Sequence, residues 1–542
     1  MQLQSRLLSV AIISALAASM PAFAASAVNP TAVAHARALI DGPAAAVIHR
    51  DSADAFVASD AIVDANGTEH VRFTRTYRGL PVIGGDFVVH SKNGQLKSIS
   101  QTLKTGARPS VIPQISSDRA IVEAGARFGT NFIGMPKTRL VVYAVKGTPV
   151  LAHEVIFSGF RTDQTPTDMH YLVNARDASI ITQADTVETA VPGPDGGSVC
   201  TGAVASVGNG KSLTEGDVPV DTMQCGAIYK LKDLTRGGGY TTNMGGLRSG
   251  LGGIVVDTDN TWGNNALNDS STVAADAHYG VSKTWDYYKN VHGRNGIANN
   301  GVGALARVHY GRNYVNAFWS DGCFCMTFGD GDNGVHYLPL IALDIAGHEM
   351  SHGVTSHTAG LVYSGESGGL NEANSDINGT MVEYYANNPN DQGDYLIGEK
   401  IYVGNTGTKA LRWMFKPSLD NRSPDCYSAD IGNLNVHYSS GVANHFYYLL
   451  AEGSVVPAGF GAGTPANLTP ASLVCAGSSA LVGIGRDAAS KIWYRALTVY
   501  MTSTTDYAAA RAATLSAATD LYGGTSAQYN AVVAAWNAVS VN

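Results

Sequence analysis

The chain has 542 residues, a formal net charge of −8 and only 15% charged side chains. This length is too great for one compact domain and predicts three or four domains. The acidic balance argues against nucleic acid or an anionic membrane surface as the main partner.

The N-terminus predicts a secretory signal peptide. A polar start that contains Arg6 precedes an apolar run at 7–18, and residues 22–24 read Ala-Phe-Ala, the small-x-small pattern of a cleavage site. The run is too short for an ordinary transmembrane helix, and no later stretch of about 18 apolar residues follows it. We therefore expect cleavage after Ala24 and a soluble protein that is secreted to the extracellular space.

The next residues, 25–105, have alanine-rich helical character and then strand patterns. Alternating side chains predict strands at 71–77 and 86–90, a turn is expected at 79–82, and Asn93-Gly94 is a hairpin signal. None of these segments has catalytic spacing.

Residues 115–186 predict a second small module, with a helix at 117–128 followed by four short strands. His90, His153 and His170 occur singly in strand patterns, so we expect them to be structural. A Pro- and Gly-containing linker follows at 187–200, and exposed linkers of this kind are common cleavage sites.

The remaining chain divides into a β-rich and a helical part. From 200 to 335, short strands in Gly- and Asn-rich sequence surround one helix at 272–292. Beyond residue 340, long helical patterns occur at 340–358, 370–386, 441–451, 484–502, 507–521 and 527–539. We expect an α+β fold with a site in the cleft between a β-rich and an α-helical lobe.

All six cysteines lie in this later part of the chain, and an even count in an exported protein predicts disulfides. Sequence proximity favours Cys200–Cys225, Cys323–Cys325 and Cys426–Cys475, among the fifteen pairings that six cysteines allow. A zinc–thiolate site is disfavoured because paired Cys-x-x-Cys spacing is absent.

The apolar stretch at 340–352 ends in His-Glu-x-x-His. A helix places His348 and His352 four residues apart on one face, where both imidazoles can bind one Zn²⁺. Glu349 between them projects near the open side of the metal. This motif predicts a zinc site that needs a third ligand.

That ligand is expected on a second helix, which opens after a glycine turn at 368–369. Glu372, Asp376, Gly379 and Glu383 recur at helical spacing and share one face. Glu372 completes a His₂Glu site with one position open for water. Asp376 can accept the ring N–H of a ligand histidine and fix its tautomer.

These motifs together resemble the thermolysin-like neutral metallopeptidases. In that family, His-Glu-x-x-His is followed by the glutamate of Gly-Gly-Leu-Asn-Glu, which here follows His352 after nineteen intervening residues. Further similar motifs are Asn-Ala-Phe-Trp at 316–319, Ala-Leu-Arg at 410–412 and Val-His-Tyr-Ser-Ser-Gly at 436–441. Residues 71–90 resemble the fungalysin/thermolysin propeptide (FTP) module, and 115–186 resemble a PepSY module.

The resemblance implies a secreted zinc-dependent neutral endopeptidase that cleaves proteins before a large hydrophobic residue. It would be a monomer, made as a preproenzyme whose propeptide serves as chaperone and inhibitor and is removed by self-processing near 187–200. The implied domains are a signal peptide (1–24), an FTP-like module (25–110), a PepSY-like module (111–190), a β-rich catalytic lobe (191–345) and an α-helical catalytic lobe (346–542).

The same resemblance assigns roles in catalysis and substrate binding. Glu349 would transfer the proton of the attacking water, and Tyr363 and His437 would stabilise the oxyanion. Substrate-binding roles fall to Asn316 and Ala317 for the peptide backbone, Arg412 for a carbonyl, and Leu340, Ile345 and Leu411 for an apolar pocket. Residues expected to support the metal ligands and the catalytic histidine are Asp376, Asn371 and Asn435.

A structural calcium site is implied by hard oxygen ligands, and one ion is favoured over two. Its expected ligands are the side chains of Asp344, Glu383, Asp394 and Glu399 and the backbone carbonyl of Leu396.

The sequence departs from the family near His437. Many relatives have an aspartate two or five residues before this histidine, whereas this chain has Asn435 and Gly432 there. An amide brings no charge, so we expect the pKa of His437 to be lower than in relatives.

Two other functions fit parts of the pattern. An exported peptide-binding or adhesion protein could keep the fold without catalysis, but the intact Glu349, Tyr363 and His437 argue against it. A zinc aminopeptidase is disfavoured because no acidic amine-binding motif is evident.

Overall fold

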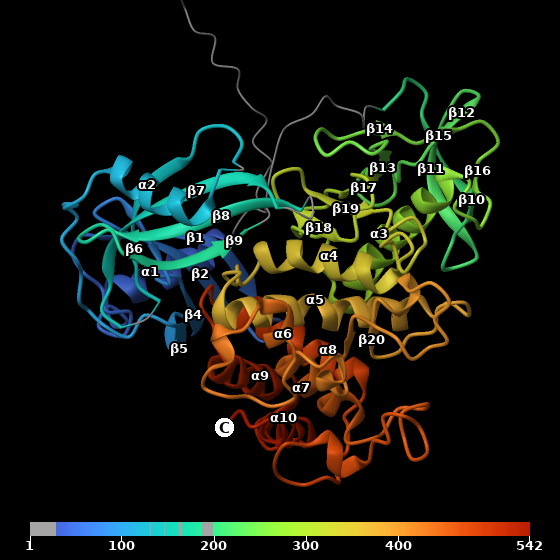
Figure 1. The fold of residues 1–542 in the computed structure, drawn as a ribbon. Coiled ribbons are helices and arrows are strands. Elements are labelled where there is room, and N and C mark those ends of the chain that lie inside the picture. The colour runs from blue at the N-terminus through green and yellow to red at the C-terminus, as the bar shows by residue number, and fades with distance from the viewer. Residues whose placement is uncertain (1–28, 131, 146, 162–164, 187–198) are drawn as a thin grey trace, which may run out of the picture.

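A computed structural model describes residues 29–130, 132–145, 147–161, 165–186 and 199–542 (Figure 1). The predicted signal peptide and most of the predicted linker lie outside the described residues. In the described ranges, no helix combines the length and the apolar character needed to cross a membrane.

The N-terminal part forms one nine-stranded sheet with two helices. The first half contains α1 (Pro30–Asp41), β1 (Asp54–Val63), β2 (Thr68–Tyr77), β3 (Leu80–Ile83), β4 (Phe87–Lys92) and β5 (Gln95–Gln101). The second half contains α2 (Ser117–Phe128), β6 (Lys137–Tyr143), β7 (Val150–Phe160), β8 (Pro166–Asn174) and β9 (Ile180–Asp185). Each half buries its own apolar cluster under its helix.

The two halves are joined by a parallel pairing of β3 with β6, in which Val82 lies opposite Val142. Most of the segment 79–82, which the sequence predicts to be a turn, therefore belongs to a short strand. Pairing with β2 on one side and β6 on the other explains why this segment is extended.

The β-rich lobe contains two five-stranded sheets, ordered β15-β12-β11-β10-β16 and β14-β13-β17-β19-β18. The first uses β10 (Val204–Lys211), β11 (Asp217–Cys225), β12 (Ile228–Lys230), β15 (Val256–Asp257) and β16 (Thr261–Gly263). The second uses β13 (Tyr240–Asn243), β14 (Gly253–Ile254), β17 (Leu305–Tyr310), β18 (Ala317–Ser320) and β19 (Cys325–Gly329). The buried helix α3 (Ser270–His292) packs against strands of both sheets and against α4.

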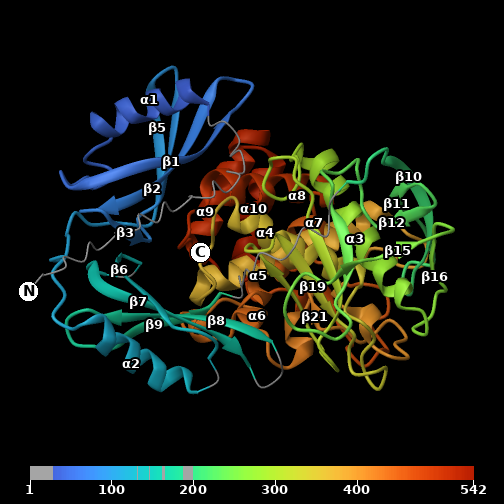
Figure 2. The same ribbon diagram turned by 90° about the horizontal axis from the view of Figure 1, so that it is seen from above.

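The helical lobe is built around α4 (Leu343–Ser356) and α5 (Gly365–Ala386), which lie side by side at the centre of Figure 1. The further helices are α6 (Val436–Ser439), α7 (Gly441–Glu452), α8 (Arg486–Arg495), α9 (Tyr507–Tyr522) and α10 (Ala527–Ala538). A two-stranded ribbon, β20 (Leu396–Ile397) with β21 (Arg412–Trp413), connects the loop after α5 to Arg412. In Figure 2 the first half of the N-terminal part lies next to α9.

The three disulfides that sequence proximity favours are all present: Cys200–Cys225, Cys323–Cys325 and Cys426–Cys475. The helices predicted at 117–128, 272–292, 441–451, 507–521 and 527–539 agree with α2, α3, α7, α9 and α10 to within two residues.

Other helix ends differ from prediction for local reasons. Leu340 donates its N–H to Gly329 of β19, so α4 begins at Leu343 instead. The glycines at 368–369 lie inside α5 rather than in a turn before it; a Cβ on Gly368 would come within 2.5 Å of Val436. The pattern at 484–502 is divided into α8 and a π-helical turn, Ala496–Tyr500.

Candidate active site and metal centre

The site depends on the close approach of α4 and α5. A Cβ built on Gly379 would lie 2.4 Å from the carbonyl oxygen of Asp344, and one on Gly347 would lie 2.9 Å from the Cα of Gly379. Both positions therefore require glycine. This contact between the helix backbones brings the histidine face of α4 against the acidic face of α5.

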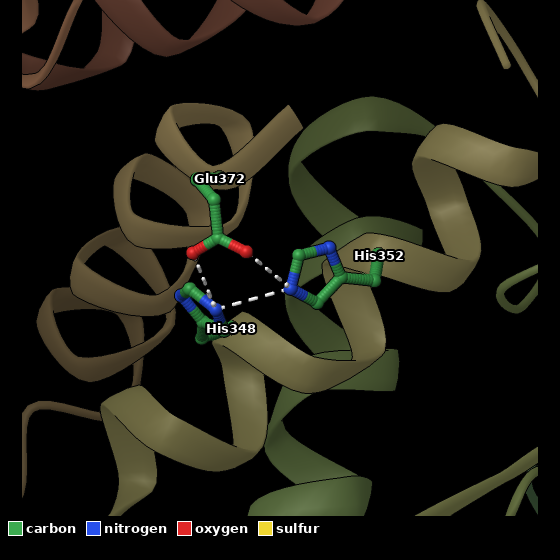
Figure 3. A group of neighbouring side chains, drawn as sticks. All are labelled: His348, His352 and Glu372. Atoms are coloured by element: carbon green, nitrogen blue, oxygen red, sulfur yellow. Dashed lines mark hydrogen bonds and ion pairs between the residues drawn. The ribbon is translucent and has the colours of Figure 1, made fainter. Parts of the chain in front are cut away.

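Three of the predicted ligands converge at this contact (Figure 3). The Nε2 atoms of His348 and His352 are 3.1 Å apart. Glu372 Oε2 lies 3.6 Å from Nε2 of His348, and Glu372 Oε1 lies 3.5 Å from Nε2 of His352. Glu372 is fully buried, and its Oε2 has no hydrogen-bond partner.

The hydrogen bonds on the far side of each ring fix which nitrogen carries the proton. Nδ1 of His348 faces Asp376 Oδ1 at 2.8 Å, and Nδ1 of His352 faces Asn371 Oδ1 at 2.8 Å. Asn371 donates its amide N–H to the carbonyl of Leu361, which orients that oxygen toward His352. Both Nδ1 atoms are thus donors, and both Nε2 lone pairs point toward Glu372. Three lone-pair donors directed at one point fit a tetrahedral metal ion such as Zn²⁺.

The charges around these ligands also favour a cation. Burial lowers the pKa of His348, but the hydrogen bond and charge of Asp376, together with Glu372, outweigh it and raise that pKa to about 9. Burial raises the pKa of Glu372, yet the neighbouring histidines, His437 first, lower it to about 2. The acids thus favour positive charge at this point, which a proton on His348 supplies without a metal and a metal ion would supply in its place.

Asp376 connects the ligands to Arg412. The Arg412 guanidinium donates to both oxygens of Asp376, at 2.7 and 2.6 Å. Asn444 of α7 also donates to Asp376 at 2.7 Å, a contact that no sequence motif indicates. Burial disfavours the charged carboxylate, but Arg412 and His348 keep the pKa of Asp376 well below its usual range.

Glu349 is buried on α4, and the charges nearest to it are His348, His352 and Glu372. Burial raises its pKa, which improves it as a proton acceptor and donor near neutral pH. The Tyr363 hydroxyl donates to Glu372 Oε1 and lies 3.3 Å from His437 Nε2. His437 lies 3.5 Å from Glu372 Oε1, so these residues border one space.

Asn435 fixes the tautomer of His437. Its Oδ1 accepts the backbone N–H of His437 at 3.0 Å and faces ring Nδ1 at 2.9 Å. Nδ1 is therefore protonated in the neutral ring, which leaves Nε2 without a proton. The His437 side chain is half exposed, and desolvation by the surrounding protein still lowers its pKa, while Glu372 opposes this shift.

The predicted substrate strand lies at the edge of its sheet. Asn316 immediately precedes β18, which pairs with β19 on one side and ends the strand order. Trp319 of this strand packs against Gly353 of α4, because a Cβ there would lie 2.6 Å from the indole. The predicted pocket residues Leu340 and Ile345 are buried in the main core, and Leu411 packs against that core.

An acidic cluster lies one turn before His348. Carboxylate oxygens of Asp344, Glu383 and Glu399 lie within 4.8 Å of one another. Asp394 donates its backbone N–H to Glu383, and its own carboxylate accepts the N–H of Leu396 at 2.7 Å. Burial and mutual repulsion raise the pKa of Asp344 to about 7, of Asp394 to about 6 and of Glu399 to about 10.

Two further acids extend this cluster beyond the predicted ligands. Asp391 is fully buried and neither of its oxygens has a hydrogen-bond partner, although Lys400 Nζ lies 3.3 Å away. Glu215, from the loop between β10 and β11, is buried with Oε2 unpartnered, and burial followed by Asp391 raises its pKa to about 10. The position of Asp391 in the same acidic segment as Asp394 is a sequence signal that could have indicated its place in the cluster. No sequence signal indicates Glu215.

Comparison with known protein families agrees with this geometry. Residues 207–356 match the model for the thermolysin metallopeptidase catalytic domain, and residues 359–541 match that for its alpha-helical domain. The chain belongs to the thermolysin metallopeptidase family. Residues 54–103 match the fungalysin/thermolysin propeptide motif, so this metallopeptidase carries a propeptide and is a zymogen.

Similar proteins cover most of the chain. The transglutaminase-activating metalloprotease of Streptomyces mobaraensis is 46% identical over 491 residues, which are 90% of this chain and 61% of that protein. Thermolysin of Bacillus sp. (strain EA1) is 37% identical over 507 residues, 88% of this chain and 84% of that protein. Among solved structures, the protealysin precursor of Serratia proteamaculans aligns with a TM-score of 0.43 and 27% identity, covering 56% of this chain and 87% of that one.

Proposed function

We propose that the protein is a secreted zinc-dependent neutral endopeptidase that cleaves proteins before a large hydrophobic residue. The observation that carries this proposal is the set of three lone-pair donors, His348, His352 and Glu372, beside the buried Glu349. The proposed domain bounds are 1–24, 25–110, 111–190, 191–345 and 346–542, for signal peptide, FTP-like module, PepSY-like module and the two catalytic lobes.

In this proposal His348, His352 and Glu372 hold Zn²⁺, which lowers the pKa of a bound water and polarises the substrate carbonyl. Glu349 takes the proton of the attacking water and passes it to the leaving amine. Asp376 and Asn371 keep the two histidine rings in the tautomer that directs Nε2 to the metal.

His437 and Tyr363 are proposed to donate hydrogen bonds to the oxyanion. Because Asn435 holds the proton of neutral His437 on Nδ1, only the imidazolium can donate from Nε2. The active form of His437 is then the protonated one. Removing one such donor costs roughly 10²–10³ in rate.

Substrate is proposed to add to the edge of β18 as an extended strand, held by Asn316 and the Ala317 backbone. Arg412 would contact a substrate carbonyl while its bidentate pair with Asp376 keeps the guanidinium in place. Leu340, Ile345 and Leu411 would form the apolar pocket for the residue after the scissile bond.

We also propose one structural Ca²⁺ held by Asp344, Glu383, Asp394, Glu399 and the carbonyl of Leu396. The unpartnered oxygens Glu383 Oε1 and Glu399 Oε2 support it, since buried carboxylates without partners are costly. Lys400 beside Asp391 already supplies one positive charge, which supports one ion over two.

The proposed zymogen is exported, processes itself within 187–200 and yields a monomeric enzyme, with the propeptide as chaperone and inhibitor. Glu349→Gln tests both catalysis and self-processing. We expect a full-length chain after removal of the signal peptide and casein digestion reduced by about 10²–10⁴.

The matched control is Glu123→Gln, on the surface of α2 in the propeptide, which should process and digest casein normally. N-terminal mass analysis and casein digestion are the two measurements. A Glu349→Gln chain that matures alone and digests casein would refute the proposed mechanism.

A further inference from the structure

The propeptide contacts the helical lobe through a set of polar contacts, here called the polar seam. The residues that form it are distant in sequence from the linker. Asp86 accepts hydrogen bonds from the backbone and hydroxyl of Ser503, and Thr102 pairs with Thr504. Arg495 of α8 donates to both oxygens of Asp64, at 3.1 and 2.8 Å. These contacts hold the FTP-like half against the turn after α8.

Two buried histidines of the propeptide lie at the centre of this seam. His70 on β2 and His90 on β4 are 3% and 2% exposed, and their Nδ1 atoms are only 2.7 Å apart. The ring of Tyr500, from the helical lobe, lies 4.8 Å from that of His90 and 6.1 Å from that of His70. Separation of the two parts would return both rings to water.

The geometry permits one proton between the two Nδ1 atoms. His70 Nε2 faces Asp64 Oδ2 at 3.1 Å, and His90 Nε2 faces the Ser100 hydroxyl at 2.8 Å. Two neutral rings satisfy this arrangement when His70 donates to Asp64 and His90 donates to His70. If both rings are protonated, two N–H groups point at each other across 2.7 Å, which cannot persist.

Charges from every neighbouring element act on this pair. Asp64 and Asp520 favour protonation of His70, whereas Arg495 opposes it. Around His90, the groups His70, Arg72, Arg495 and Lys97 all oppose protonation. Burial is the largest influence on both, lowering the pKa of His70 and lowering that of His90 to about 3.

Asp64, His70 and Asp520 also lie within metal-binding distance of one another. Arg495 donates to both of these carboxylates, however, so the cation in this cluster is its guanidinium. The cluster therefore does not indicate a metal site.

We propose that His70 and His90 form a proton-operated latch: the neutral pair holds the propeptide on the helical lobe, and protonation of the pair releases it. The docked state binds fewer protons than the separated parts, in which the two rings can turn apart in water and each titrates at the ordinary value of about 6.5. Docking is therefore strongest above that pH and weakens as the pH falls through it. When the pH falls from 7.5 to 5.5, each histidine raises the dissociation constant of the propeptide by about tenfold. The two together raise it by up to about 100-fold.

The test uses the Glu349→Gln proenzyme with a site for a sequence-specific protease placed within 187–198. After the cut, release of the propeptide from the immobilised catalytic part is measured at pH 7.5 and 5.5. We expect dissociation to be up to about 100-fold more favourable at pH 5.5. This readout measures binding without hydrolysis, so its failure is distinct from failure of the proposed peptidase function.

Two variants sharpen the test. In the double variant His70→Gln/His90→Gln, the dissociation constant of the propeptide should be the same at both pH values. Thr102→Val removes a contact of the seam in which neither partner titrates. It should therefore raise the dissociation constant by the same factor at both pH values.

A wild-type dissociation constant that is equal at the two pH values overturns the latch, and so does a double variant that keeps the wild-type pH dependence. If the double variant does not fold, calorimetry of wild-type release at pH 6 in two buffers counts protons directly. Uptake of more than one proton supports the latch, and uptake of none refutes it.

Discussion

The two clusters of candidate metal ligands on α4 and α5 lie one helical turn apart and differ in their electrostatic character. Around His348, His352 and Glu372, the histidines and Arg412 offset the acids, so that Glu372 has a pKa of about 2. Around Asp344, Glu383 and Glu399, acids face acids, and the pKa of Asp344 rises to about 7. In the first cluster, positive and negative charges balance even without a metal. In the second, the carboxylates repel one another until protons or a cation neutralise them.

This difference separates activity from stability. Loss of zinc should leave the helices packed but without catalysis, whereas loss of calcium should loosen the loop that connects α5 to Arg412 through β20 and β21. Three substitutions and the removal of calcium test this difference.

The largest effect is expected from Gly379→Ala, which damages both clusters. The new methyl group would lie 2.4 Å from the carbonyl oxygen of Asp344 and 3.2 Å from the backbone nitrogen of His348, so the helices must separate. We expect a loss of about 1–3 kcal/mol in the free energy of unfolding, with lower zinc and calcium content. Gly253→Ala, at an open position, should change stability by less than about 0.5 kcal/mol. Wild-type metal content in Gly379→Ala would contradict the close-contact argument.

Calcium removal should have the next largest effect, and it should depend on pH. Without calcium, the acids of the cluster hold protons up to about pH 6 for Asp394 and about pH 7 for Asp344, well above their unfolded values. Stability of the calcium-free protein therefore falls as the pH rises through this range. Calcium at 100 times its dissociation constant adds about 2.7 kcal/mol.

Thermal unfolding with calcium or with a calcium chelator checks this. The gap in Tm should widen from pH 5 to pH 8, and removal of zinc with a zinc-selective chelator should give a smaller gap. If the difference in Tm with and without calcium stays constant with pH, repulsion among the carboxylates does not dominate this cluster.

Asp376→Asn should weaken zinc binding by about 10–100-fold, because the neutral amide supports His348 and Arg412 less well. Calcium affinity should remain unchanged, since Asp376 belongs to the zinc side of α5. Competition with a chromophoric chelator measures the zinc affinity. Asp487→Asn, at an exposed position of α8, is the control. Equal zinc affinity in both variants would remove Asp376 from the metal site.

Asn435→Asp should produce the smallest effect, a shift in pH dependence. Protonated His437 is the proposed active form, so activity falls as the pH rises through its pKa, which the surroundings lower. A nearby carboxylate favours the imidazolium and should move this alkaline limb upward by about one pH unit. Profiles of kcat/KM for the two proteins measure it, and coincident limbs would contradict the assigned role of Asn435.

Much of the zinc site could be predicted because its residues recur at helical spacing within two short segments. The same periodicity predicts that Asp376 shares the face of Glu372, and the structure brings its carboxylate to His348. Periodicity says nothing about contacts between distant segments. Asn444 reaches Asp376 from α7, and Glu215 reaches the acidic cluster from another lobe, without any local signal.

The same limit applies to the fold. The expected turn around Leu80 and Pro81 fails because β6, more than fifty residues later, pairs with that segment. The glycine pair at 368–369 predicts a turn before Glu372, but glycine also serves where chain segments approach closely, as at Gly368 beside Val436. Local sequence cannot distinguish these two uses of glycine.

The pairing of β3 with β6 has a mechanical consequence. One end of the continuous propeptide sheet holds the helical lobe through Asp64 and Arg495, and near its other end Thr165 accepts a hydrogen bond from Tyr314 of the β-rich lobe. The sheet is therefore fastened to both lobes and bridges them. Freeing one end leaves the other attached at high local concentration, so the propeptide leaves the enzyme only when both attachments have opened.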